Sequence, residues 1–96
     1  MKGPGTLENL LYAAATDERL TTTHLAVYCA LLTVWIRDHQ TNLVNISRSE
    51  IMQLAKIKSI TTFHMCIRHL VVTKFIKYSP SYHPTKLSTV SFIVES

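Results

Sequence analysis

The fold is decided by the stretch SRSEIMQLAKIKSITTFHMCIRHLVVTK, which covers residues 47–74. It holds two segments with helical periodicity, and the short basic sequence KIK at residues 56–58 separates them. The first segment opens with an S-x-x-E capping box, in which Ser47 and Glu50 satisfy free amide groups at a helix start. The residues expected to face inward from this helix are Ile51, Leu54 and Ala55.

The second segment predicts a helix that begins after Ser59 and runs to about residue 72. Its apolar side chains recur every three to four residues, so one stripe faces the core. The inward positions are Phe63, Cys66, Ile67 and Leu70, and Val71 and Val72 extend the apolar end. The outward positions are Thr61, Thr62, Met65, Arg68 and His69, with Ile60 and His64 at the boundary.

Two more helices and a strand are expected before this stretch. Residues 6–15 predict a short helix capped by Thr6, and residues 22 to about 39 predict the longest helix, capped by Thr21 or Thr22. The long helix is apolar over so much of its circumference that we expect it at the centre of the core. Residues 43–46 predict a short strand. The inward positions are Leu7, Leu10, Leu11 and Ala14 in the first helix, and Leu25, Tyr28, Leu32, Trp35 and Ile36 in the second.

Beyond residue 74 the apolar period changes from 3.6 to 2. Residues 75–79 and 87–94 are rich in β-branched and aromatic side chains and predict two strands, and the proline-bearing residues 80–86 predict the loop between them. Two helices joined by a tight turn and followed by such a hairpin form a winged helix-turn-helix. We therefore expect a mainly α fold with a small β-sheet, in the α+β class. Residues 1–5 are expected to be a disordered lead, and residues 6–96 one domain, with an N-terminal helix in 6–19 and a winged-helix core in 20–96.

The positive charge is concentrated in one part of the chain. Residues 1–47 carry three Lys or Arg and four Asp or Glu, whereas residues 48–86 carry seven Lys or Arg and Glu50 alone. A basic region joined to a near-neutral one is typical of nucleic-acid-binding proteins. A solvated basic face without a partner gives the same charge pattern, so the periodicity has to decide between the two.

The composition excludes several other classes. With 47% hydrophobic and 17% charged residues, the chain is not a disordered polymer. Its two glycines lie within the first five residues, so the glycine-rich phosphate loops of Rossmann and P-loop proteins are absent from the sequence. We find neither a signal peptide nor a membrane-spanning segment and expect no membrane partner. The expectation is a soluble, cytoplasmic protein with Cys29 and Cys66 as buried, reduced thiols.

Neither a metal centre nor an active site is expected, and no cofactor is implied. Cys29, His64, Cys66 and His69 lack the short paired spacings of a structural zinc site, and His64 and His69 point about 140° apart on a helix. The six acidic residues are scattered, without a pair placed for acid and base chemistry. The chain is therefore not expected to be an enzyme.

Residues 20–94 resemble bacterial winged helix-turn-helix DNA-binding proteins, and in particular small ones carried on mobile and plasmid-like elements. The resemblance is carried by LTTTH at 20–24, ISRSEI at 46–51, TFH at 62–64 with Cys66 and Ile67, and FIKYSPSY at 75–82. It implies that residues 59–72 form the recognition helix, which enters the major groove of double-stranded DNA with its N-terminal turns. It also implies a role in transcription control, or as an accessory factor in replication or excision of a mobile element.

The same resemblance implies roles for individual side chains. Arg68 would reach a guanine edge or a phosphate, and Lys56, Lys58 and Arg48 would anchor phosphates. The full set in the recognition helix and the turn before it is Lys56, Lys58, Ser59, Ile60, Thr61, Thr62, His64, Met65 and Arg68. The set on the flanking backbone and wing is Arg48, Lys77, Tyr82, His83 and Lys86.

The chain departs from the family at two positions of the recognition helix. Related helices often carry basic or amide side chains where this one has Ile60 and Met65, which contact a thymine methyl but make no bidentate base pair contact. This leaves open an alternative, a winged-helix module that docks a protein through its Ile60–Met65 face. The leucines of the N-terminal helix need a cover, either their own domain or a second copy, so a homodimer through this helix is also open.

Overall fold

The computed structural model describes residues 4–81 and 87–93, and these residues form four helices and three strands. The coarse class expected from the sequence, helices combined with a small β-sheet, is confirmed. In chain order the elements are α1 (Pro4–Thr16), α2 (Thr22–Arg37), β1 (Val44–Ile46), α3 (Arg48–Ala55), α4 (Ile60–Val72), β2 (Ile76–Ser79) and β3 (Ser88–Phe92).

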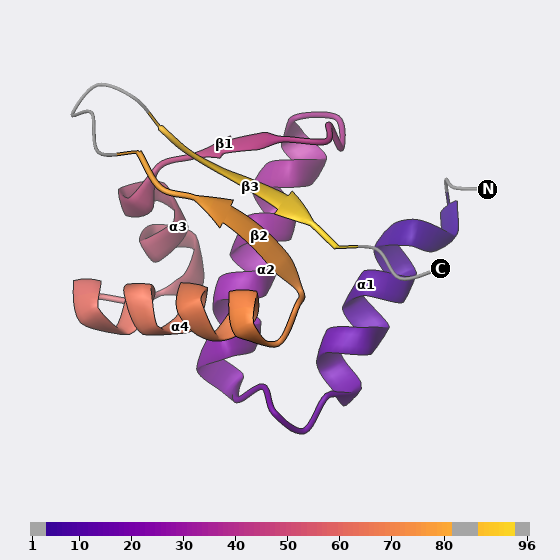
Figure 1. Cartoon of the computed structure of the whole chain (residues 1–96), viewed down its shortest axis with the longest axis horizontal. Helices are drawn as coiled ribbons and strands as arrows, with labels where there is room; N and C mark the ends of the chain where they lie inside the picture. The colour runs from indigo at the N-terminus through magenta and orange to yellow at the C-terminus, as the bar shows by residue number, and fades with distance from the viewer. Residues whose placement is uncertain (1–3, 82–86, 94–96) are drawn as a thin grey trace.

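Helix α2 is the centre of the molecule. Figure 1 shows it behind the sheet, with α3 and α4 on one side and α1 on the other. Seven of its sixteen residues are buried, among them Tyr28, Leu31 and Trp35. The central position expected for this helix is therefore confirmed. From α1, Leu10 and Ala14 pack into the same core, so the domain itself covers this part of the N-terminal helix.

The sheet is antiparallel, with strand order β1-β3-β2. Val90 of β3 lies opposite Val44 on one side and Tyr78 on the other, so the strand that comes last in the chain is in the middle. The sheet packs on α2 partly through Trp35, whose ring centroid lies 5.0 Å from that of Phe92. The indole N–H of Trp35 donates to the Thr41 carbonyl oxygen at 2.9 Å, which fixes the turn between α2 and β1.

Side-chain caps begin three of the helices. Thr21 caps α2 and Ser59 caps α4, as expected. Ser47 accepts the Glu50 amide at 3.4 Å, but the reciprocal half of the expected capping box does not form, because the Glu50 carboxylate pairs with Arg37 of α2. The complete capping box is at α2, where the His24 ring accepts the backbone N–H of Thr21 at 3.0 Å.

Several expected positions are wrong. Helix α1 begins at Pro4, before Thr6, because proline suits the first helical position, and residues 1–3 lie outside the described chain. Three residues expected to face inward, Leu11, Ile36 and Leu54, are 40–47% exposed. They lie at the margins of their stripes, where periodicity does not say how wide the covered face is. On α3, Met52 and the following Ile57 pack on the core instead of Leu54.

The two cysteines differ. Cys66 is buried as expected, whereas Cys29 lies on the exposed side of α2, contrary to the expectation of a buried thiol. Val71 and Val72 are also exposed, because α4 is covered only on the face that packs against α2, α3 and β2. The apolar end of α4 is therefore surface.

Candidate nucleic-acid interface

Unpaired positive charge marks the part of the chain from α3 to β2. Its six basic residues are exposed, and within residues 4–81 and 87–93 none of them makes an ion pair: Arg48, Lys56, Lys58, Arg68, Lys74 and Lys77. The acid in the same stretch, Glu50, is already paired with Arg37. This stretch therefore offers six cationic side chains to an anionic partner.

The turn between α3 and α4 directs its lysines to solvent. Lys56 ends α3 in the left-handed conformation, with φ 65° and ψ 38°, and its amide remains bonded to carbonyl oxygens of that helix. Ile57 is half-buried and packs on the core, and its amide donates to the Met52 carbonyl at 2.9 Å. Because Ile57 turns inward, Lys56 and Lys58 on either side of it are exposed.

A groove of about 540 Å³ runs between α3 and the start of α4. Three of the sequence-predicted residues lie around it: Arg48 from the first turn of α3, Lys58 from the turn, and Ile60 from the first turn of α4. Met52 and Ile57 give it apolar walls, and Ser49 and Gln53 add polar ones. The fold thus brings together two predicted phosphate anchors and one predicted groove-facing residue.

The first two turns of α4 present few free polar groups. The Ser59 hydroxyl accepts the Thr62 amide at 3.2 Å as the helix cap, and Thr62 itself is half-buried. Thr61 is exposed, Ile60 is 48% exposed and Met65 is 65% exposed. Apolar side chains therefore make up much of this surface.

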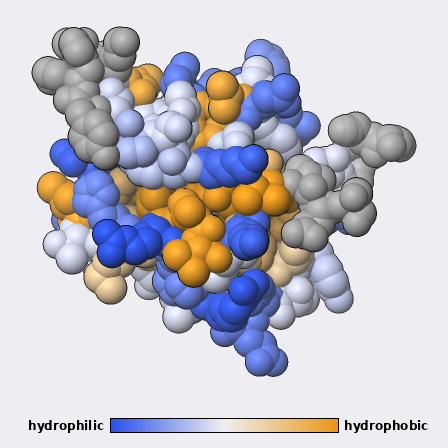
Figure 2. Space-filling view, viewed as in Figure 1, coloured by the Kyte–Doolittle hydropathy of each residue, from blue (hydrophilic) through white to orange (hydrophobic). Residues whose placement is uncertain are grey.

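A second groove, of about 430 Å³, lies between α4 and β2. His64 and Arg68 contribute its polar side, Ile67 and Val71 its floor on α4, and Tyr78 and Pro80 the opposite wall. His64 is exposed with its ring edge-on to that of Phe63, at 5.2 Å between centroids. Figure 2 shows hydrophobic atoms gathered over α4 and β2 in this view, with hydrophilic side chains around them.

The remaining predicted residues lie apart from these grooves. Lys77 is on β2 next to Tyr78, and because successive strand residues face opposite sides, it points away from the face that lines the second groove. Tyr82, His83 and Lys86 lie outside the described residues. The structure therefore groups the predicted residues of α3, the turn and α4, and does not join Lys77 to them.

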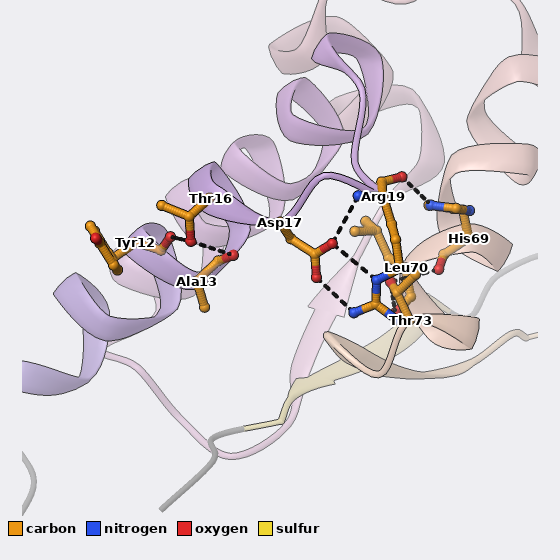
Figure 3. Close-up of polar contacts among 8 residues, drawn as sticks. All are labelled: Tyr12, Ala13, Thr16, Asp17, Arg19, His69, Leu70 and Thr73. Carbon is orange, nitrogen blue, oxygen red and sulfur yellow. Dashed lines mark hydrogen bonds and ion pairs between the residues drawn. The ribbon is translucent and has the colours of Figure 1, made fainter.

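His69 was expected to point outward, and this is wrong. Its ring stacks on that of His24, with centroids 4.0 Å apart and 11° between planes, and its Nε2–H donates to the Arg19 carbonyl oxygen at 2.7 Å. Figure 3 shows this bond beside the ion pair between Arg19 and Asp17. Hydrogen bonds from Arg19 lower the pKa of Asp17 to about 2. His69 therefore holds the segment before α2 against α4.

This cluster was missed because nothing in the local spacing signals it. Arg19 and His69 are 50 residues apart, and each looks like an ordinary surface residue in its own segment. Burial and the neighbouring His69 lower the pKa of His24, which keeps its ring neutral as an acceptor of the Thr21 amide. The cluster is a tertiary contact that joins α4 to the N-terminal part of the chain.

The described residues offer little for other chemistry. In residues 4–81 and 87–93, no three His, Cys, Asp or Glu side chains gather to hold a metal ion. Burial raises the pKa of the Cys66 thiol, which makes it a poor nucleophile. No helix in those residues is long and apolar enough to cross a membrane. Comparison of the chain with protein-family models, with curated proteins and with solved structures finds no match.

Proposed function

We propose that this protein is a winged helix-turn-helix module that binds double-stranded DNA. The observation that carries the proposal is the set of exposed, unpaired cations around the start of α4: Arg48, Lys56, Lys58 and Arg68. A duplex rewards such cations because each phosphate contact releases condensed counterions. The biological role follows from the family resemblance, and is transcription control or accessory action in a mobile element.

The order of elements supports the same proposal. Helix α3, a four-residue connection and helix α4 follow one another, and the hairpin β2–β3 comes next, with β1 added to its sheet. In a winged helix this order puts the second helix of the pair into the major groove and the hairpin on the flanking backbone. Here α4 would enter the groove through its N-terminal turns, Lys56, Lys58 and Arg48 would contact phosphates, and Arg68 would reach a base edge or a phosphate.

The salt dependence of binding tests the proposal. Four phosphate contacts predict a slope of about −3.6 for log affinity against log salt, and so about a hundredfold loss of affinity between 50 and 200 mM salt. Fluorescence anisotropy with a 25-base-pair duplex measures it. No binding at 50 mM salt would overturn the proposal.

A matched pair of variants locates the contact surface. Lys58→Gln should bring the slope about 0.9 closer to zero for every duplex, because one phosphate contact is lost. Lys74→Gln removes the same charge from the other end of α4, about 20 Å along the helix axis and beyond the Debye length, and should leave the slope unchanged. Equal effects of the two variants would place the contact elsewhere.

A second candidate is a protein-docking module, which the exposed apolar side chains of α4 favour. Ile60 and Met65 are the largest of these near the start of the helix. Association through them would be insensitive to salt, unlike phosphate binding, so the same titration separates the two candidates.

A homodimer through α1 also stays a prediction. Leu10 and Ala14 are covered by the domain, and Leu11 and Tyr12 are the exposed apolar residues of that helix. Sedimentation of the protein with and without the substitution Tyr12→Lys measures whether a dimer uses this face. A monomer at all concentrations tested would exclude it.

A further inference from the structure

We infer that the exposed face of α4 recognises the C5-methyl groups of thymine in the major groove. The inference rests on the proposed DNA binding and adds to it the kind of base that is read. It predicts a preference for duplexes that present major-groove methyl groups, beyond the general attraction of the basic side chains for phosphate.

The first reason is the chemistry of the side chains at the start of α4. Ile60 and Met65 are 48% and 65% exposed, and the exposed Thr61 has a methyl group of its own. Methyl-bearing side chains are the partners that a thymine methyl takes in the major groove. The three residues therefore form a methyl-rich surface on the two turns that the proposed function puts against base edges.

The second reason is their arrangement. At 100° per residue, Ile60 and Met65 lie about 140° apart, on the two flanks of the outward line made by Thr61 and Arg68. Along the helix axis they are separated by about 7.5 Å, which is close to two base-pair steps. Each flank can therefore meet a different base pair.

The third reason is the shortage of other readers. Helix α4, Ile60–Val72, has no Asn or Gln, the side chains that pair with adenine through two hydrogen bonds. The Ser59 hydroxyl is engaged as the cap, and Thr62 is half-buried. Thr61, His64 and Arg68 are the hydrogen-bonding side chains left exposed on this helix. Discrimination of A·T from G·C pairs by the first two turns must then come largely from methyl contact.

The size of the effect follows from the burial of apolar groups. Removing one methyl from water contributes a factor of about four in affinity, so two methyl contacts contribute about fifteenfold. Phosphate contacts do not change when a methyl is removed from a base, so the salt slope should stay the same.

The test compares 25-base-pair duplexes that differ only in C5-methyl groups. One A·T-rich duplex carries thymine and its twin carries uracil, which keeps every hydrogen-bonding group and every phosphate. A G·C-rich duplex with cytosine and its twin with 5-methylcytosine add the same methyl to the other base pair. Anisotropy at 50 mM salt should show tighter binding to the methylated member of each pair, by about fourfold to fifteenfold.

Variants assign the effect to residues. Met65→Gln and Ile60→Gln should bring the thymine-to-uracil affinity ratio close to one, because they replace the methyl surface with an amide. Val72→Gln makes the same change at the exposed last turn of α4, away from the first two turns, and should keep the ratio. All three sites are exposed, so the fold should survive, and circular dichroism checks this.

The outcomes separate the inference from the proposed function. Equal affinity for thymine and uracil duplexes, with a steep salt slope, would overturn the methyl inference and leave DNA binding in place. Absence of binding to all four duplexes at 50 mM salt would overturn the proposed function itself. A thymine preference unchanged in Met65→Gln and Ile60→Gln would show that other residues make the contact, and would refute the inference as stated.

Discussion

Replacing Tyr28 with phenylalanine should make the protein more stable. The Tyr28 side chain is fully buried in α2, and its hydroxyl has no hydrogen-bond partner within the described residues. Its ring packs edge-on against Phe75 and Phe92, at 5.4 and 5.7 Å between centroids. Phenylalanine keeps both ring contacts and removes the polar atom that the core leaves unsatisfied. Burial also raises the pKa of Tyr28, so the hydroxyl stays neutral throughout the usual pH range.

The magnitude follows from the two changes. A buried, unsatisfied hydroxyl costs about 1–3 kcal/mol, and the small space left by one oxygen atom returns part of this as lost packing. We expect Tyr28→Phe to raise the free energy of unfolding by about 1 kcal/mol, which raises Tm by about 4–8 °C in a domain of this size. Urea unfolding should show a higher midpoint with an unchanged m-value.

Tyr78→Phe is the matched control. The Tyr78 hydroxyl donates to Ser88 Oγ at 3.3 Å, so its loss should lower the free energy of unfolding by about 0.5–1.5 kcal/mol. Opposite signs for the two variants are the expected result. If Tyr28→Phe destabilises the protein by 1 kcal/mol or more, the Tyr28 hydroxyl has a partner and the reasoning is refuted.

Three further predictions concern the other clusters. Because the pKa of His24 is lowered from 6.5 by burial and by His69, the unfolded chain binds more protons below pH 6.5; stability should be full above that pH and decline as the pH falls, and His24→Gln should flatten this decline in urea unfolding. A thiol reagent such as dithionitrobenzoate should label the exposed Cys29 rapidly and the buried Cys66 only on unfolding, and equal rates would contradict the packing of α4. Ser59→Ala should lower the free energy of unfolding by about 1 kcal/mol through loss of the α4 cap, whereas Ser59→Asp should restore most of it; equal stability of the two variants would show that the cap is unimportant.

Local rules in the sequence account for most of the fold. Capping residues such as Thr21 and Ser59, and the inward stripe of α4, are determined by neighbours within one or two helical turns, and the structure agrees with them. The errors lie where tertiary contact decides. Leu54 continues the apolar period of α3, but the core reaches only as far as Ile51 and Ala55. Periodicity gives the direction of a stripe and not its width.

The candidate site divides in the same way. Lys56 and Lys58 could be found because a turn between two helices exposes charged side chains almost wherever it lies. The role of His69 could not be found, because its partners Arg19 and His24 belong to a distant segment. Lys77 was placed with the other cations by charge alone, and only the strand register shows which face it takes.

The central position of β3 has a consequence for how the chain folds. Val44 has to wait for Val90, 46 residues later, before β1 has a partner, and β2 waits for the same strand. Loop closure over that distance is slow compared with the formation of helices α2 to α4, which depend on nearby residues. During synthesis the helices would therefore exist before the sheet, with the apolar faces of β1 and β2 uncovered. The last strand completes both edges in one step, so a ribosome that stalls just before residue 88 releases a chain that is helical, sticky and a substrate for chaperones.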